Sequence, residues 1–313
     1  MAMHEDQLHI DAAVARELID ESFPEFRAEP LQAVNSSGTV NAIYRVGDHA
    51  VARFPLQSGD PDGVTSWLRA EATASRAFVE QCPFPTPQPL GIGRAGHSYP
   101  LPWSMHTWLV GSVATPTGLE ASDAFARDVA VLLASLRQAD TRGRRFSGVG
   151  RGGVLGDHDA WLETCFAHSG GLLDVAVLRS MWRKLRMLRP ADSVVMSHTD
   201  LTPANILVNG ERIVGVLDAG GYGPADPALD LVAVWHLLDP KRRDIVRTHL
   251  HSDREEWLRG AGWAFAQALG LAQHLHVAAV AAAPAPGEGR AAGRAGDRPA
   301  RPGHHRPAAA VRR

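Results

Sequence analysis

The hydrophobic positions of the N-terminal region follow a helical spacing twice. Apolar residues from Ile10 to Ile19 recur on one helical face, and Asp11 lies where a capping residue is preferred. We therefore predict a helix over residues 8–21. A second helix is expected over Ser66–Val79, with its first residue as the N-cap.

Strand patterns lie between and after these two helices. Two apolar runs, Ala42–Val46 and His49–Phe54, flank a Gly-Asp pair at 47–48, which predicts a hairpin with a two-residue turn. Residues 82–89 contain four prolines and are expected to form an extended connection, because proline cannot continue a helix. A further strand is predicted over Ser104–Leu109. The N-terminal part of the chain is therefore expected to be rich in strands.

From Ser122 onward the pattern becomes mainly helical. Apolar residues from Phe125 to Leu136 form one stripe, and Ser122 or Asp123 would cap the helix that this stripe predicts. Residues 143–156 are rich in glycine and are expected to form a loop. The other helices predicted here are Asp157–Ala167, Leu173–Leu188, Leu229–Leu238 and Arg254–His274, with strands and loops over 195–227.

Composition limits what the chain is expected to bind. Of its 313 residues, 45% are hydrophobic and 21% charged, which is ordinary for a globular protein. The net charge of −2 favours neither nucleic acid nor membrane as a partner. The N-terminus has no signal-peptide pattern, no long apolar stretch is present and only two cysteines occur, so a cytoplasmic protein is expected. Residues 278–313 are almost wholly Ala, Pro, Gly, Arg and His and are predicted to be disordered. The oligomeric state stays open.

The strongest chemical signal is a polar segment that precedes a second predicted hairpin. The Asn-Gly pair at 209–210 separates two apolar runs and is typical of a tight turn. With a two-residue loop there, Asp218 would lie opposite Leu201. Asp200 and Asn205 would then lie at the same end of the hairpin as Asp218.

Two carboxylates and an amide oxygen in one cleft are hard oxygen ligands, which suit Mg²⁺. Mg²⁺ usually binds through one or two carboxylates and the phosphates of a substrate. Phosphoryl transfer needs such a metal, and it needs a residue that orients and deprotonates the attacking hydroxyl. The residue types at this end of the hairpin therefore point to phosphoryl transfer.

Three motifs carry a resemblance to a known family. Residues 198–205, His-Thr-Asp-Leu-Thr-Pro-Ala-Asn, resemble the catalytic loop H-x-D-x-x-x-x-N that protein kinases share with aminoglycoside phosphotransferases. Residues 217–220 resemble the metal-binding D-x-G segment, and residues 223–231 resemble the G-x-x-D-P-x-x-D-L segment of the aminoglycoside phosphotransferase family. The resemblance covers roughly residues 10–276.

The resemblance implies an α+β, two-lobed, protein-kinase-like fold. A smaller, strand-rich lobe would bind the nucleotide and cover residues 1–109. A mostly helical lobe over residues 110–277 would hold the catalytic groups and the acceptor. The cofactors implied are Mg²⁺ and either ATP or GTP.

The resemblance also implies roles for the polar residues of these three motifs. Asp200 would be the catalytic base, and Asn205 and Asp218 would be metal ligands. Asp226 and Asp230 would brace the loop. His198, between these groups in sequence, is interpreted as a packed, hydrogen-bonded support.

The N-terminal half contains matches to the nucleotide-binding residues of the family. Arg53 lies where the family has the lysine that binds the phosphates, and arginine keeps the charge that this role needs. Glu71 resembles the glutamate that pairs with that cation; the alternative interpretation is that both residues are ordinary surface groups.

Two further segments are expected to contact the nucleotide. Ser37 and Gly38 belong to a small polar loop that would lie over the phosphates, although the loop lacks G-x-G-x-x-G. Backbone groups near Trp108 and Leu109 would bind the base.

The predicted function is ATP- or GTP-dependent transfer of phosphate onto a small-molecule hydroxyl. Only eleven residues separate Asp218 from Asp230 and no A-P-E segment follows, which leaves no room for the activation loop of a protein kinase. The acceptor is predicted to be an aminoglycoside or related antibiotic. A sugar- or choline-like metabolite is an alternative, and the arginine at position 53 leaves a catalytically weak pseudokinase as another. Acids that would suit a cationic acceptor are Asp157, Asp159, Glu163, Asp239 and Glu255.

Overall fold

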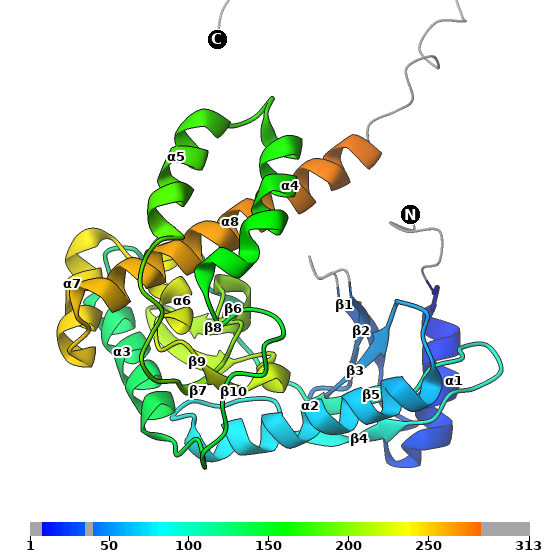
Figure 1. Ribbon diagram of the computed structural model, residues 1–313. Coiled ribbons are helices and arrows are strands. Elements are labelled where there is room, and N and C mark those ends of the chain that lie inside the picture. The colour runs from blue at the N-terminus through cyan, green and yellow to red at the C-terminus, as the bar shows by residue number, and fades with distance from the viewer. Residues whose placement is uncertain (1–7, 35–39, 283–313) are drawn as a thin grey trace, which may run out of the picture.

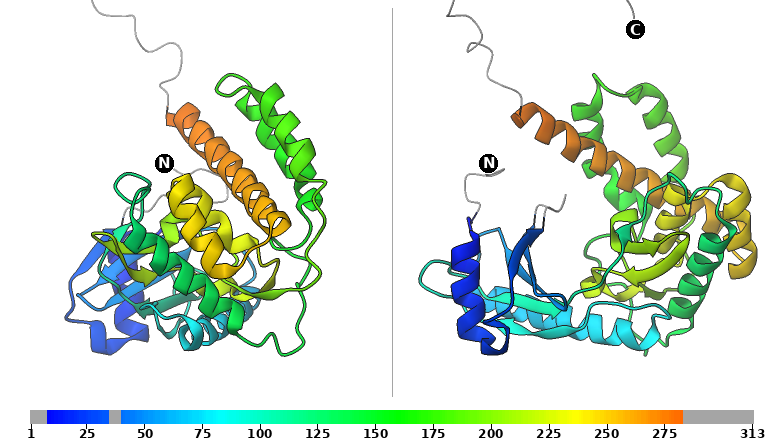
Figure 2. Two further views of the ribbon diagram at one scale, coloured as in Figure 1. Left: turned by 90° about the vertical axis from the view of Figure 1, so that its left-hand side faces the viewer. Right: turned by 180° about the vertical axis from the view of Figure 1, so that it is seen from behind.

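The computed structural model describes residues 8–34 and 40–282, and the side chains of 271–282 are not considered. Figure 1 shows a strand-rich lobe built from the first part of the chain and a larger, mostly helical lobe built from the rest. Figure 2 shows the same two bodies from the side and from behind, with α2 running along both of them. The predicted α+β, two-lobed architecture is confirmed.

One antiparallel sheet and two helices make the smaller lobe. The sheet has the order β1-β2-β3-β5-β4. Its strands are β1 (Leu31–Val34), β2 (Asn41–Val46), β3 (Ala50–Pro55), β4 (Pro89–Gly93) and β5 (Trp103–Thr107), and its helices are α1 (Ala12–Ser22) and α2 (Pro61–Gln81). α1 covers one face of the sheet, where Ile19 packs in a core with Phe54 and Trp103. Arg53 and His106 alternate with these buried residues along β3 and β5, which directs them to the opposite face, toward α2.

The larger lobe packs six helices around two small sheets. β6 (Ser112–Val113), β8 (Ile206–Asn209) and β9 (Arg212–Val216) form one sheet, and β7 (Val195–Ser197) with β10 (Gly223–Ala225) forms the other. The helices are α3 (Asp123–Gln138), α4 (Asp159–Ser169), α5 (Val175–Leu185), α6 (Val232–Leu237), α7 (Pro240–Leu250) and α8 (Arg254–Ala282). The five-stranded sheet ends at Thr107 and β6 already pairs with β8, so we keep the lobe boundary at 109/110 as a proposal.

Capping residues set the helix starts. The Asp11 carboxylate accepts from the N–H groups of Ala13 and Val14, and Ser122 accepts from Phe125 N–H, as the sequence predicted. α2 begins five residues before the predicted Ser66, because Asp60 caps it and proline occupies its first position.

Other boundaries also differ from the sequence prediction. Val46 pairs with Ala50, so the first hairpin has a three-residue loop, in which Gly47 has φ +57°. α8 continues past His274 and includes residues 278–282, which we expected to be disordered; residues 283–313 lie outside the described part of the chain. Among the described helices, none is long and apolar enough to cross a membrane.

α2 connects the two lobes. Near its C-terminal end the ring of Phe78 meets the rings of His198 and Tyr222 edge-on, with centroids 5.3 and 5.2 Å apart. Its middle turn places Glu71 beside Gly220, two residues after Asp218. The helix therefore fixes the sheet, and Arg53 within it, relative to the polar segment after β7.

Candidate active site

The segment that follows β7 is held by a buried carboxylate. Asp230, which is 5% exposed, accepts hydrogen bonds from His198 N–H at 2.9 Å and Thr199 N–H at 3.2 Å. Burial raises the pKa of the Asp230 carboxyl, and the neighbouring His198 opposes that shift. Thr199 has φ +71°, a left-handed conformation that is costly for a β-branched residue. Asp230 thus stabilises the strained turn that presents Asp200.

His198 is a support, as the sequence indicated. Its side chain is fully buried, its Nδ1 accepts from Asp200 N–H at 3.3 Å, and its Nε2 lies 2.8 Å from the carbonyl of Leu217. Since Nδ1 accepts, the ring proton must be on Nε2 and is donated to Leu217. The imidazole therefore ties the Asp200 segment to the residue before Asp218.

The predicted register of the second hairpin is wrong by three residues at the site. Asn209 pairs with Arg212, so the turn is Gly210-Glu211, and a bulge near Val208 adds one more residue of offset. Gly210 has φ +58°, which explains why glycine begins the turn. As a result Leu217 N–H donates to Asn205 at 2.8 Å, and Asp218 lies beside Asn205 instead of Leu201.

The three predicted residues nevertheless meet at one end of the hairpin. The amide nitrogen of Asn205 donates to the Asp200 carbonyl at 2.8 Å and lies 3.4 Å from Asp200 Oδ2. Asp218, with φ +60°, turns its carboxylate into the space between the lobes, where Arg53 contacts its Oδ1 at 3.0 Å. Asp200 also forms an ion pair with Arg151, a residue that the sequence interpretation did not single out.

Arg53 and Glu71 lie together but do not form the ion pair expected between them. Arg53 pairs with Asp218, while a Cβ on Gly220 would lie 2.9 Å from Glu71 Oε1. Glycine at 220 therefore leaves room for the glutamate beside Asp218. Burial raises the pKa of Glu71, and Arg53 opposes that shift whereas Asp218 adds to it. Of these two acids, Asp218 is the one that pairs with Arg53 in this structure.

The backbone N–H groups near Trp108 and Leu109, which were expected to bind the base, differ in their use within the fold. The N–H groups of Thr107 and Trp108 already donate to the carbonyls of Gln88 and His49. Leu109 is thus the first residue beyond β5 whose N–H has no such partner among the described residues. Ser37 and Gly38, expected over the phosphates, lie outside the described residues.

A cavity of about 430 Å³ separates α2 from β4 and β5. Its lining includes Glu71, Arg76 and the buried His106. The pKa of His106 is lowered to about 4 by burial, and Arg53 and Arg76 add to the effect while Asp218 opposes it. This imidazole is therefore neutral at pH 7.

The shift of His106 predicts a loss of stability in acid. An unfolded chain binds a proton on this histidine below pH 6.5, whereas the folded chain binds it only near pH 4. The free energy of unfolding should therefore fall as the pH drops from 6.5 to 4, by about 3 kcal/mol from this group. Urea unfolding of wild type and His106→Gln at several pH values measures it. If the difference in the free energy of unfolding between the two proteins stays constant from pH 6.5 to 4, the lowered pKa of His106 is contradicted.

Most acids considered for a cationic acceptor are paired with arginines. The pairs are Asp159 with Arg186, Glu163 with Arg179 at 2.7 Å, Asp239 with Arg242 at 3.2 Å and Glu255 with Arg189 at 3.6 Å. Within the described residues, only Asp157 of the five has no such ion pair. The negative charge expected to attract a polycation is thus largely neutralised.

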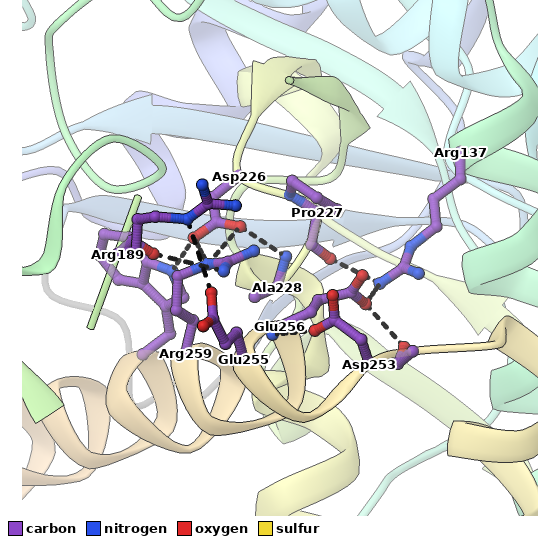
Figure 3. A network of polar contacts seen from close by, with 11 residues as sticks. Arg137, Arg189, Asp226, Pro227, Ala228, Asp253, Glu255, Glu256 and Arg259 are labelled. Atoms are coloured by element: carbon purple, nitrogen blue, oxygen red, sulfur yellow. Dashed lines mark hydrogen bonds and ion pairs between the residues drawn. The ribbon is translucent and has the colours of Figure 1, made fainter. Parts of the chain in front are cut away.

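Asp226 anchors the segment after β10 to α8 (Figure 3). Its carboxylate, 2% exposed, accepts from Arg259 Nε at 3.0 Å, from Trp263 Nε1 at 3.1 Å and from Ala228 N–H at 2.9 Å. Every bond is internal to the larger lobe. This confirms the interpretation of Asp226 as a structural brace.

A two-lobed fold whose larger lobe gathers Asp200, Asn205 and Asp218 at one hairpin end has the architecture of the protein-kinase-like phosphotransferases. The chain belongs to the phosphotransferase enzyme family (APH), whose model matches residues 32–295. No curated protein matches the sequence.

Solved structures share the fold at low sequence identity. The GDP and kanamycin complex of APH(2")-IIia has a TM-score of 0.66 and 18% identity, with 84% of this chain and 92% of that chain covered. The GDP complex of wild-type aminoglycoside 2'-phosphotransferase-IIIa gives 0.63 and 16%, covering 84% and 91%. Macrolide 2'-phosphotransferase MphH from Brachybacterium faecium, as apoenzyme, gives 0.54 and 22%, covering 83% and 93%.

Proposed function

We propose that this phosphotransferase moves the γ-phosphate of ATP or GTP onto a hydroxyl of a small molecule, an aminoglycoside or related antibiotic. The observation that carries the proposal is the meeting of Asp200, Asn205 and Asp218 at one end of the second hairpin. A cytoplasmic location, where both nucleotides are available, is part of the proposal.

The chemistry is a direct displacement at the γ-phosphorus. The acceptor oxygen forms a bond to phosphorus while the bond to the β,γ-bridging oxygen breaks, and the electron pair leaves with the nucleoside diphosphate. Asp200 accepts the proton of the acceptor hydroxyl, because its carboxylate is held at the end of a rigid loop. No covalent intermediate is needed, so positioning provides most of the catalysis.

The residues present fit a magnesium ion. Asn205 uses its amide nitrogen on Asp200, which leaves its oxygen as a ligand, and the Asp218 carboxylate provides a second. Mg²⁺ held by these two residues and by the phosphates would neutralise the negative charge that develops during transfer.

Arg53 and Glu71 would position the nucleotide. The Asp218 carboxylate cannot at once keep its ion pair with Arg53 and bind a metal equally well. We therefore propose that Arg53 turns to the phosphates and toward Glu71 when the nucleotide binds. Arginine can contact phosphate oxygens through two N–H groups, and lysine provides a point charge.

Removing this cation should weaken nucleotide binding. Arg53→Ala is expected to raise the nucleotide KM by about 10- to 100-fold, since a charged hydrogen bond is lost. Arg53→Lys should stay within a few-fold of wild type. Steady-state kinetics on both variants measure this, with Arg94→Ala, an exposed arginine of the same lobe, as the control. An unchanged KM in Arg53→Ala would exclude the role.

The paired acids favour a second candidate acceptor. Four of the five candidate acids carry arginine partners, which reduces the electrostatic preference of this lobe for a polycation. A weakly charged acceptor, such as a macrolide or a sugar-like metabolite, is therefore the second candidate. The aminoglycoside and macrolide enzymes among the structural neighbours support both kinds. The presence of Asp200, Asn205 and Asp218 together disfavours a pseudokinase.

A nucleotide-consumption screen tests the proposal. ATP or GTP with Mg²⁺ is supplied with a panel of aminoglycosides, macrolides, nucleoside antibiotics, sugars and choline, and the release of diphosphate is followed. We expect acceptor-dependent turnover that EDTA abolishes. Folded protein that binds nucleotide but turns over none of these acceptors would favour the binding role of a pseudokinase instead.

A further inference from the structure

The loop between α3 and α4 reaches the catalytic carboxylate. Its fixed point is Gly152, whose φ of +118° favours glycine and whose Cβ would lie 2.6 Å from the Cβ of Ala225. Asp226 N–H donates to the Gly152 carbonyl at 2.8 Å, so the loop is bonded to the segment after β10. Only a glycine can sit this close to β10, and this contact places Arg151 beside Asp200.

Arg151 and Asn205 hold the two oxygens of the Asp200 carboxylate separately. An Nη2 atom of Arg151 donates to Oδ1, and the Asn205 amide lies 3.4 Å from Oδ2. The side chains of Arg151 and Asp200 are only 29% and 37% exposed, so solvent and ions screen their attraction less than at an open surface. Each oxygen keeps a lone pair for a further donor, so the contact leaves room for the acceptor hydroxyl.

No residue of the catalytic loop itself supplies a positive charge. Residues 198–205 contain neither lysine nor arginine, although phosphoryl transfer gathers negative charge around the loop. The pKa of His158 is lowered by its burial and further by the nearby charge of Arg151. The nearest cation to Asp200 therefore comes from a loop 49 residues earlier in the chain.

We propose that Arg151 is a positioning residue for the phosphoryl transfer, a role that rests on the proposed function. It fixes the rotation of the Asp200 carboxylate so that the free lone pairs face the acceptor hydroxyl. It also offsets the negative charge that Asp200 presents beside the phosphates. The guanidinium acts through Asp200 and takes no proton itself, because arginine stays charged.

Kinetics on three variants test the role. Arg151→Met should lower kcat by about 10- to 100-fold, because a misplaced base costs rate even when binding is intact. The KM values for nucleotide and acceptor should change by less than about 3-fold, and Arg151→Lys should restore part of kcat. Arg145→Ala is the matched control, because Arg145 is an exposed arginine of the same loop whose side chain makes no hydrogen bond or ion pair among the described residues.

The split between kcat and KM separates this role from a structural one. A general loosening of the loop would lower the thermal midpoint and raise both KM values, so midpoints are measured for every variant. Arg151→Met with wild-type kcat, or with a loss that Arg145→Ala reproduces, would overturn the role of Arg151 alone. Wild type that transfers phosphate to none of the acceptors would overturn the proposed function and this role with it.

Discussion

Asp200→Asn is expected to reduce kcat by about 10²- to 10⁴-fold while nucleotide affinity stays near that of wild type. The amide has almost the shape of the carboxylate, and its one oxygen can still accept from Arg151, while Asn205 keeps its bond to the backbone carbonyl of residue 200. It cannot accept the proton of the acceptor hydroxyl, so only the chemical step should fail. Single-turnover transfer and nucleotide titration measure the two effects separately.

Asp192→Asn is the control for this variant. Asp192 is an exposed loop acid that pairs with Arg189, and its replacement should leave kcat within about 2-fold. Full activity in Asp200→Asn would mean that another group accepts the proton. The assignment of the site would then be wrong even if the enzyme transfers phosphate.

Asp226→Ala should lower the free energy of unfolding by about 3–5 kcal/mol, because it leaves the buried charge of Arg259 without a partner. Trp263 and the N–H of Ala228 would lose their acceptor as well. Urea unfolding monitored by tryptophan fluorescence measures the change. Asp192→Ala, which removes the exposed pair with Arg189, should cost about 1 kcal/mol or less.

The loss of stability in Asp226→Ala should not be accompanied by a loss of activity in the folded protein. Within the described residues the Asp226 side chain makes no hydrogen bond or ion pair with Asp200, Asn205 or Asp218, and alanine keeps the backbone N–H that bonds to Gly152, so Asp226→Ala should keep its kcat at temperatures where it is folded. Equal destabilisation by Asp226→Ala and Asp192→Ala would show that the buried network does not stabilise the larger lobe.

The sequence predicted the site where local patterns determine geometry. A hairpin must bring its two ends together, and the spacing from Asp200 to Asn205 follows one short loop, so both could be inferred without the fold. The exact pairing could not, because the bulge near Val208 and the turn at Gly210-Glu211 depend on how β8 packs against β6. Asp200, Asn205 and Asp218 still lie close together despite the wrong register, because a shift of three residues leaves them at the same end of the hairpin.

Long-range contacts were outside the reach of the pattern. Arg151 stands in a glycine-rich loop with other arginines, and only the close approach of Gly152 to Ala225 selects it as the partner of Asp200. Arg53 pairs with Asp218 and not with the expected Glu71, and this choice likewise depends on the distance between the two lobes. The arginine partners of the acceptor-side acids were missed for the same reason.

Direct observation of the transferred phosphate tests the central claim. Phosphorus NMR of the enzyme with Mg²⁺, nucleotide and an acceptor from the screen should show the γ-phosphate signal replaced by that of a phosphomonoester, in equal amount to the diphosphate formed. The signal should not appear with Asp200→Asn. Release of inorganic phosphate alone, or an unchanged spectrum from folded protein that binds nucleotide, would contradict phosphoryl transfer to a small-molecule hydroxyl.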